Sequence, residues 1–166
     1  MADTRFEVIG VPGLPMVEPG DSLVDLIQQA LRDISESLQD GDVVCVAQKI
    51  VSKAEGRLIR LDDVEPSTAA IELAAETDKD PRLVELILSE SDEVLRKKPG
   101  VLIVRHKRGF VMANAGIDQS NVDHAGGDQA LLLPTDPDAS AARLREQLQS
   151  LSSVSVGVVI VDSANR

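Results

Sequence analysis

Apolar and polar positions form two kinds of pattern in the first part of the chain. Residues 5–11, RFEVIGV, alternate between apolar and polar side chains, which predicts a β-strand. A loop rich in proline and glycine follows at residues 12–21. Residues 22–38 then place apolar side chains at helical spacing, with Ser22 as the N-cap and Gly41 beyond the end. We therefore expect a strand, a loop and an amphipathic helix, in that order.

A short apolar run, DVVCVA at residues 42–47, has the length of a strand. The segment after it, SKAEGRLIRL at residues 52–61, is expected to be extended or hairpin-like. Cys45, the single cysteine, lies within the apolar run, which excludes a disulfide framework and predicts a buried, reduced thiol.

Two further helices are predicted from their capping residues. Ser67 precedes TAAIELAAET, residues 68–77. Asp80 and Pro81 open RLVELILSESDEVLRK, residues 82–97, with proline at the first helical position, where its missing N–H costs nothing. We expect both segments to be helical throughout.

The last part of the chain predicts a hairpin, a helix and a strand. Residues 102–116, LIVRHKRGFVMANAG, read as a hairpin that turns at residues 107–109. Asp136 and Pro137 begin a helix that places three leucines on one face: Leu144, Leu148 and Leu151. The β-branched run VVIVDS, residues 158–163, predicts a strand covered on both faces. Strands and helices thus interleave, and the fold class is α/β.

Composition narrows the possible functions. The 166 residues suit one medium domain or most of one, and the net charge of −11 disfavours binding to nucleic acid or to anionic membrane surfaces. Phe6 and Phe110 are the only rings among Phe, Tyr and Trp, so base stacking is not a binding principle here. His106 and His124 are too few for a histidine zinc site, and solvated or core-edge roles are expected. The N-terminus has neither a basic leader nor a long apolar stretch, so a cytoplasmic protein is expected.

Hard oxygen ligands follow two of the predicted strands. Asp162 and Ser163 come at the end of the last strand, and Asp118 comes two residues after Gly116, in a loop with Ser120 and Asn121. Carboxylates and hydroxyls of this kind suit Mg²⁺ or Mn²⁺. The alternative is that each aspartate only caps a turn or a helix, and the residues alone leave both open.

Basic residues recur at a spacing of four: Lys49, Lys53 and Arg57. This spacing puts side chains on one face of either a helix or a strand, so the row is a candidate anion cradle. The alternative is a solvated charged edge. Neither G-x-x-x-x-G-K-[ST] nor G-x-G-x-x-G occurs, so a phosphate ligand would not be bound by the common nucleotide motifs.

Five ordered stretches resemble one known family: PGLPMV (residues 12–17), GDVVCVAQKIVSKAEGR (41–57), NAGIDQSNV (114–122), LLLPTDPDASAARLR (131–145) and VGVVIVDSANR (156–166). Together they are similar to the coenzyme F420-0:L-glutamate ligases, which use GTP to attach γ-linked L-glutamate to coenzyme F420-0. The resemblance implies a mixed sheet with flanking helices, neither Rossmann nor P-loop. It also implies a homodimer. The expectation of no nucleic-acid or membrane partner follows from the net charge.

The resemblance also implies site residues. Those that match the family's GTP contacts are Leu14, Pro15, Met16, Val17, Gln48, Lys49, Lys53 and Asn121. Those that match its ligands for divalent metal, Mg²⁺ or Mn²⁺, are Asp118, Asp162 and Ser163. Two departures bear on these roles: Gln48 and Lys49 replace small hydroxyl residues, and Ser163 replaces a threonine but keeps its hydroxyl.

Residues 1–166 resemble only the N-terminal part of the family, whose C-terminal block supplies further metal and substrate contacts, and we expect a fragment of a longer ligase. The implied reaction is phosphoryl transfer from GTP to a carboxylate, giving an acyl phosphate that the amine of L-glutamate attacks. It requires no serine or cysteine nucleophile, and no catalytic side chain is assigned. The alternative is a catalytically idle nucleotide-binding or assembly module.

Overall fold

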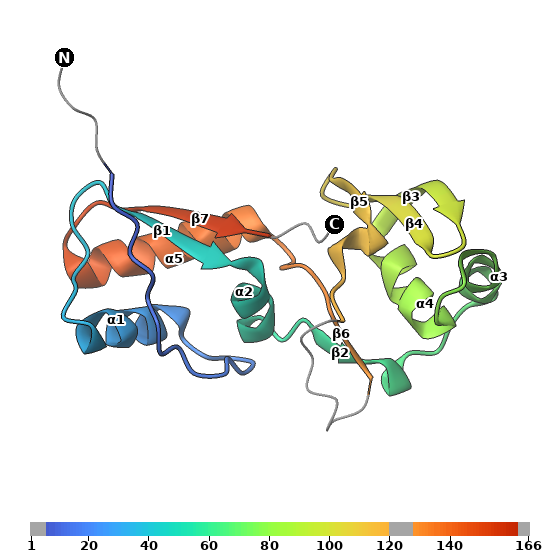
Figure 1. The fold of residues 1–166 in the computed structure, drawn as a ribbon, viewed down its shortest axis with the longest axis horizontal. Coiled ribbons are helices and arrows are strands. Elements are labelled where there is room, and N and C mark those ends of the chain that lie inside the picture. Colours follow the sequence, from blue (N-terminus) through green and yellow to red (C-terminus); the bar gives the residue numbers. More distant parts are fainter. Residues whose placement is uncertain (1–5, 120–127, 163–166) are drawn as a thin grey trace, which may run out of the picture. The chain divides into compact units, whose positions relative to one another are not determined.

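The computed structural model describes residues 6–119 and 128–162, and it confirms the mixed α/β class (Figure 1). The chain divides into two compact units. Unit 1 comprises Met1–Glu55 and Asp136–Arg166, and unit 2 comprises Gly56–Thr135. Each unit has its own hydrophobic core. The sequence length suits one medium domain, but the chain forms two smaller units, each with a separate core.

Unit 1 is a two-stranded parallel sheet with helices. Its elements are α1 (Leu23–Asp33), β1 (Val43–Ala47), α2 (Gln48–Ala54), α5 (Pro137–Ser152) and β7 (Gly157–Val161). In the β1–β7 sheet Val43 lies opposite Gly157 and Ala47 opposite Val161. A parallel pair needs a long crossover connection, and here that connection contains all of unit 2.

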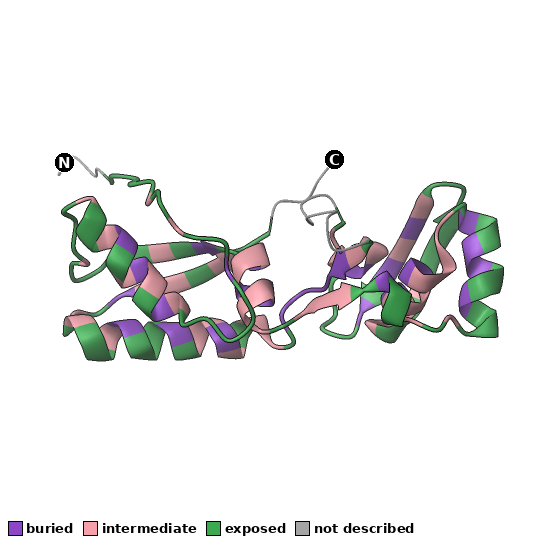
Figure 2. Cartoon of the chain, turned by 90° about the horizontal axis from the view of Figure 1, so that it is seen from below, coloured by how far each residue is buried: buried purple, intermediate pink, exposed green. Residues whose placement is uncertain are grey.

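The core of unit 1 lies between its sheet and the helices α1 and α5. Its buried side chains are Val24, Ile27, Val46, Val51, Leu144, Leu148 and Val156. Figure 2 shows buried and exposed positions alternating along these helices, as the amphipathic patterns predict. Leu151 departs from the predicted face of α5, because it is 58% exposed.

The first predicted helix is correct in its start and too long at its end. Ser22 Oγ accepts a hydrogen bond from the Asp25 N–H at 3.4 Å, as an N-cap does. The helix ends at Asp33, because Ser35 has a φ of 59° and the Glu36 N–H donates back to the Leu31 carbonyl at 2.9 Å. A left-handed residue at this point stops a helix that was expected to reach residue 38.

The strand predicted at residues 5–11 was wrong for the residues that the structure describes. Residues 6–11 have no regular structure, and Phe6 and Val8 are 90% and 83% exposed. Alternation produces a strand only where another strand offers hydrogen bonds, and no described strand pairs with this segment.

The β1–β7 sheet also corrects two burial predictions. Side chains of β7 were expected to be covered on both faces, but Val159 and Val161 are each 46% exposed. Cys45, expected to be buried, is exposed. In each strand alternate residues point away from the core, and the described helices of unit 1 share a core with the other face of this sheet.

Unit 2 packs two helices against a three-stranded antiparallel sheet, with a second, two-stranded sheet. Its elements are β2 (Leu58–Arg60), η1 (Leu61–Asp63), α3 (Thr68–Thr77), α4 (Pro81–Ser89), β3 (Ser91–Lys98), β4 (Val101–His106), β5 (Val111–Ala113), η2 (Asn114–Gly116) and β6 (Gln129–Leu131). The strand order is β3-β4-β5 in one sheet and β2-β6 in the other, all antiparallel. The core includes the fully buried Val84, Ile87, Leu102 and Val104.

The capping residues predicted both helices of unit 2 correctly at their starts. Ser67 Oγ accepts from the Ala70 N–H at 3.2 Å, and Asp80 Oδ1 accepts from the Arg82 N–H at 2.8 Å. The second helix, predicted to run to residue 97, was wrong beyond Ser89. Residues 91–98 form β3 instead, because β4 offers a full antiparallel partner across the turn at Gly100.

The hairpin predicted at residues 102–116 is confirmed as β4 and β5. The His106 N–H donates to the Phe110 carbonyl at 2.8 Å, and Gly109 takes a φ of 84° in the turn. Residues 52–61, predicted to be extended or hairpin-like, include the end of α2, a turn, β2 and the first residue of η1. The prediction was therefore wrong for residues 52–54 and for Leu61.

Arg82 holds a cluster of carboxylates at the start of α4. Its guanidinium lies 2.7 Å from Asp80 Oδ2 and 2.9 Å from Asp62 Oδ1. The hydrogen bond from Arg82 lowers the pKa of Asp80 below its ordinary value of 3.8, although partial burial opposes this. The ionised carboxylate therefore stabilises the folded state above pH 3.8, and this contribution is lost as the pH falls through the lower folded pKa.

Asp80→Asn is expected to lower the free energy of unfolding at pH 7 by about 0.5 kcal/mol, since the pair is partly exposed. Asparagine keeps an N-cap oxygen, so the change removes the charge and one of the two oxygens that accept from the Arg82 guanidinium. The deficit should disappear below the folded pKa of Asp80, and urea unfolding from pH 7 down to pH 2.5 measures it. Asp92→Asn, on an exposed position of β3, is the control. A deficit that is the same at every pH would contradict the assigned role of the charge.

Candidate functional site

The loop at residues 14–17 and helix α2 lie together in unit 1. Lys53 Nζ donates to Met16 Sδ at 3.2 Å, and the Gly20 N–H donates to the Ala54 carbonyl at 2.9 Å. Val17 is 4% exposed and fixes the loop to the unit, whereas Met16 is 70% exposed. The structure thus brings together two stretches, far apart in sequence, that both carry predicted GTP contacts.

The predicted GTP contacts in this loop differ in their exposure. Leu14 is partly buried and Pro15 is exposed, so the loop presents Pro15 and Met16 to solvent. Their neighbour Val17 faces the interior. If the loop holds a planar base, its exposed side chains and its backbone groups are the parts that would contact it.

Helix α2 carries two lysines on one face and a buried glutamine side chain. Lys49 and Lys53 are four residues apart on this helix and therefore share a face. Gln48 is 5% exposed, and its Nε2 donates to Ser52 Oγ at 2.6 Å. Its amide side chain is thus a structural part of unit 1, and Lys49 and Lys53 are the residues of α2 best suited to an anionic ligand.

Arg57 does not continue the basic row. Helix α2 ends at Ala54 and Gly56 takes a φ of 68°, so the spacing of four no longer places Arg57 on the same face. In unit 2 its Nη2 lies 2.7 Å from Glu90 Oε2, and its Nε donates to the Leu133 carbonyl at 2.9 Å. The sequence spacing was therefore a correct guide for two of the three basic residues.

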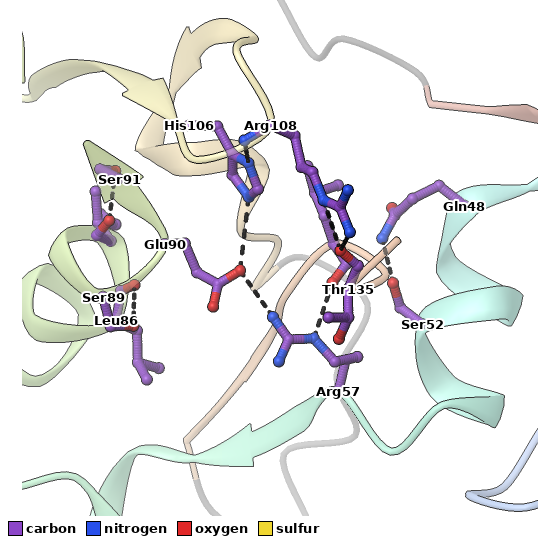
Figure 3. Close-up of polar contacts among 12 residues, drawn as sticks. Gln48, Ser52, Arg57, Leu86, Ser89, Glu90, Ser91, His106, Arg108 and Thr135 are labelled. Atoms are coloured by element: carbon purple, nitrogen blue, oxygen red, sulfur yellow. Dashed lines mark hydrogen bonds and ion pairs between the residues drawn. The ribbon is translucent and has the colours of Figure 1, made fainter. Parts of the chain in front are cut away.

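Glu90 also faces a buried histidine (Figure 3). His106 is 3% exposed, its Nε2 lies 3.5 Å from Glu90 Oε2, and its Nδ1 accepts from the Arg108 N–H at 3.0 Å. Burial lowers the pKa of His106, although Glu90 opposes this by favouring the charged imidazolium. The ring is therefore neutral at pH 7. Of the solvated or core-edge roles expected for the two histidines, the core-edge role is confirmed for His106, and His124 lies outside the described residues.

Arg57→Met is expected to lower the free energy of unfolding at pH 7.5 by about 2 kcal/mol, because it leaves the mostly buried Glu90 carboxylate without its guanidinium. The unpaired carboxylate should raise the pKa of His106, since Arg57 disfavours the imidazolium in the native protein. If the pKa of His106 in the folded variant is above its ordinary value of 6.5, protonation of His106 stabilises the folded state below pH 6.5. This stabilisation is lost as the pH rises through the folded pKa.

The measurements are urea unfolding at pH 7.5 and 5.5 and an NMR titration of His106. The deficit should be smaller at pH 5.5. Arg60→Met is the matched control, because the Arg60 side chain is 55% exposed and its Nη2 lies 3.7 Å from Asp62 Oδ2. An unchanged His106 pKa in the Arg57 variant would show that the three side chains do not act together.

Asp118 follows a turn of unusual backbone conformation in unit 2. Asn114, Ala115 and Gly116 have φ values of 51°, 53° and 71°. The chain therefore leaves β5 abruptly, as the glycine predicted. Asp118 then exchanges two backbone hydrogen bonds with Leu131, at 3.0 and 2.9 Å, so the main chain fixes its position.

The other predicted metal ligands lie elsewhere in the sequence. Asp162 is exposed immediately after β7, in unit 1. Ser163 and Asn121 lie outside the described residues. Within residues 6–119 and 128–162, no three or more His, Cys, Asp or Glu side chains are grouped so that they could hold a metal ion. Convergence of Asp118 and Asp162 on one metal site therefore stays a prediction.

The sequence profile of the family described as F420-0:Gamma-glutamyl ligase matches residues 13–166. The match includes the loop before α1, the lysine pair of α2 and both candidate aspartates. The chain belongs to the F420-0:Gamma-glutamyl ligase family. The resemblance inferred from five ordered stretches is thereby confirmed.

Several curated proteins of this ligase family are similar over nearly all of the chain. The coenzyme F420:L-glutamate ligase of Methanothermobacter thermautotrophicus is 45% identical over 161 residues, and that of Methanopyrus kandleri is 46% identical over 156 residues. The coenzyme F420:L-glutamate ligase of Archaeoglobus fulgidus is 44% identical over 162 residues. The matches cover 97%, 94% and 98% of this chain.

The same matches cover 63%, 59% and 61% of the three relatives. The chain thus spans about three fifths of the length of the curated F420-0:Gamma-glutamyl ligases that it matches. Among the described residues, none of the helices is long and apolar enough to cross a membrane.

Proposed function

We propose that this chain takes part in a GTP-dependent ligase reaction that adds γ-linked L-glutamate to coenzyme F420-0. The observation that carries the proposal is 45% identity, over 97% of the chain, to a coenzyme F420:L-glutamate ligase. The exposed loop beside Lys53 supports a role for this part of unit 1 in nucleotide binding. We extend the proposal to a homodimer in the cytoplasm, on the resemblance alone.

The proposed reaction has two steps. A terminal carboxylate oxygen of coenzyme F420-0 attacks the γ-phosphorus of GTP, the bond to the β-phosphate oxygen breaks, and GDP leaves. The amine of L-glutamate then attacks the resulting acyl carbon, phosphate leaves with the bonding electron pair, and the nitrogen loses a proton. Both steps depend on positioning and on neutralising charge, so no covalent protein intermediate is needed.

Lysine and loop residues have distinct roles in this proposal. The Lys53 ammonium donates to phosphate oxygens, exchanging its contact with Met16 for a charged acceptor. Lys49, on the same face of α2, adds a second positive charge. The loop at residues 14–17 lies against the guanine, and Asn121 supplies a polar contact to the nucleotide.

Oxygen donors of the predicted metal site fit a hard divalent cation. Asp118, Asp162 and Ser163 would hold Mg²⁺ or Mn²⁺, which prefer carboxylate and hydroxyl oxygen. When bound, such an ion neutralises negative charge on the transferring phosphoryl group. An acidic chain with net charge −11 would otherwise repel a triphosphate.

A catalytically idle nucleotide-binding or assembly module is the second candidate. It is favoured by one observation, that the matches cover only about three fifths of each relative. The two functions separate in one experiment, in which the purified chain is mixed with GTP, L-glutamate, coenzyme F420-0 and Mn²⁺. A mass increase of one glutamyl residue on the coenzyme supports the ligase, and GTP binding in calorimetry without any such product supports the module.

Lys53→Gln is expected to weaken GTP binding at least tenfold, because a charge-assisted hydrogen bond contributes about 1.5–3 kcal/mol. Calorimetric titration with GTP measures the change. Lys98→Gln, at an exposed position of β3 in unit 2, is the matched control and should bind GTP like the unsubstituted chain. Equal affinity of both variants would remove Lys53 from the proposed site.

A further inference from the structure

One face of the β1–β7 sheet in unit 1 is apolar and open to solvent. Paired residues of the two strands, Val43, Cys45 and Ala47 with Gly157, Val159 and Val161, form this open face. Val43 is 59% exposed, Val159 and Val161 are each 46% exposed, and no charged residue is among the six. The alternate side chains, such as Val46, pack into the core of unit 1 on the other side.

An exposed apolar sheet face of this kind is unusual on the surface of a complete folded domain. Strands with β-branched runs in parallel sheets are normally covered on both faces, and exposed apolar patches mark interaction sites. Each of the two strands also has one side without a neighbouring strand among the described residues. Such edges present rows of backbone N–H and C=O groups that pair readily with another strand.

We propose that the open face and the strand edges beside it dock a strand-forming polypeptide, namely the part of the family domain that lies outside the match to this chain. The match covers 63% of the Methanothermobacter relative, so this part is the remaining 37% of that protein. Only a polypeptide offers backbone donors and acceptors for the edges together with apolar side chains for the face. The inference rests on family membership and is independent of the proposed reaction.

Cys45 supplies the probe, because it is the single cysteine of the chain and lies within the open face. The full chain, carrying an affinity tag, is co-expressed with the unmatched part of the Methanothermobacter relative as a separate polypeptide. Copurification and native mass spectrometry report binding. The rate of Cys45 modification by a maleimide reports whether the open face is covered.

The expected result is a one-to-one complex in which Cys45 reacts at least tenfold more slowly than in the chain alone. Failure to copurify would overturn the proposal, as would a complex in which Cys45 reacts at its original rate. If Cys45 becomes protected in the chain alone as its concentration rises, with the mass of a dimer, a second copy covers the face and the proposed occupant is wrong.

Two lysine substitutions give the matched comparison. Val159→Lys places a charge on the open face, and Ile71→Lys places one on α3 of unit 2, where Ile71 is 52% exposed. Both positions are exposed, so neither change should unfold the chain, which circular dichroism verifies. Val159→Lys is expected to reduce the copurified partner at least tenfold and Ile71→Lys to leave it unchanged. Equal yields from the two variants would contradict docking on this face.

Discussion

In the proposed reaction, Asp118→Asn is expected to reduce the addition of glutamate to coenzyme F420-0 at least about 100-fold, because a divalent ion held by Asp118 would contribute several kcal/mol of charge stabilisation. The side chains are nearly the same size, and Asp118 is held by backbone hydrogen bonds to Leu131 that the substitution leaves in place. The loss should therefore come without unfolding. Mass spectrometry of the coenzyme product measures the activity.

The control separates metal binding from structure. Asp63→Asn changes an exposed carboxylate of η1 in the same unit and should retain full turnover. Titration with Mn²⁺, followed by electron paramagnetic resonance, should show weaker binding in the Asp118 variant only. Turnover equal to that of the unsubstituted chain with Asn at position 118, or equal Mn²⁺ affinity of the two proteins, would remove this residue from the proposed site.

Gly116→Ala is expected to lower the free energy of unfolding by about 3 kcal/mol, from positive-φ strain together with overpacking. Gly116 has a φ of 71°, and a Cβ built on it lies 2.9 Å from Leu133 Cδ1 and 3.1 Å from Met112 Cε. The first contact is shorter than real Cβ contacts, and Leu133 is buried, so it cannot easily move aside. Urea unfolding measures the loss.

Alanine substitutions at two other glycines separate the backbone strain at positive φ from the steric contact with Leu133. Gly109 has a φ of 84° and no atom within 4 Å of the position that a Cβ would take, so Gly109→Ala should cost only the backbone term, about 1 kcal/mol. Gly10 also has open space and no positive φ, so Gly10→Ala should be neutral. Equal losses at Gly116 and Gly109 would show that the contact with Leu133 contributes nothing.

Helix starts were predictable because their signals are local. Ser67, Asp80 and Asp136 each cap the helix that follows them, as the sequence indicates. The capping side chain and the N–H that it satisfies are two or three residues apart, so no tertiary information is needed.

Strands were harder to predict because they depend on partners. Residues 91–98 follow a helix without a break in polarity, and only their pairing with β4 makes them a strand. Residues 6–11 have the alternation of a strand but no described partner. In both cases the deciding contact is absent from the local sequence.

The residues of the candidate site also differ in how far the local sequence predicts them. The pair Lys49 and Lys53 could be predicted because one short helix carries both residues. Arg57 could not, because its role depends on Glu90, which is 33 positions away in sequence. The loop at residues 14–17 was predicted to contact the nucleotide from the family resemblance alone. Its composition and spacing predict only a loop between two elements.

The insertion of unit 2 between the two strands of unit 1 has a consequence for synthesis on the ribosome. β1 emerges early, but its partner β7 ends at Val161, after the whole of unit 2 has been made. Unit 2 is continuous in sequence and has a core of its own, so it is free to fold first. Until β7 arrives, the nascent β1 strand is without its partner, and slow translation of the last helix would prolong its exposure to chaperones and to aggregation.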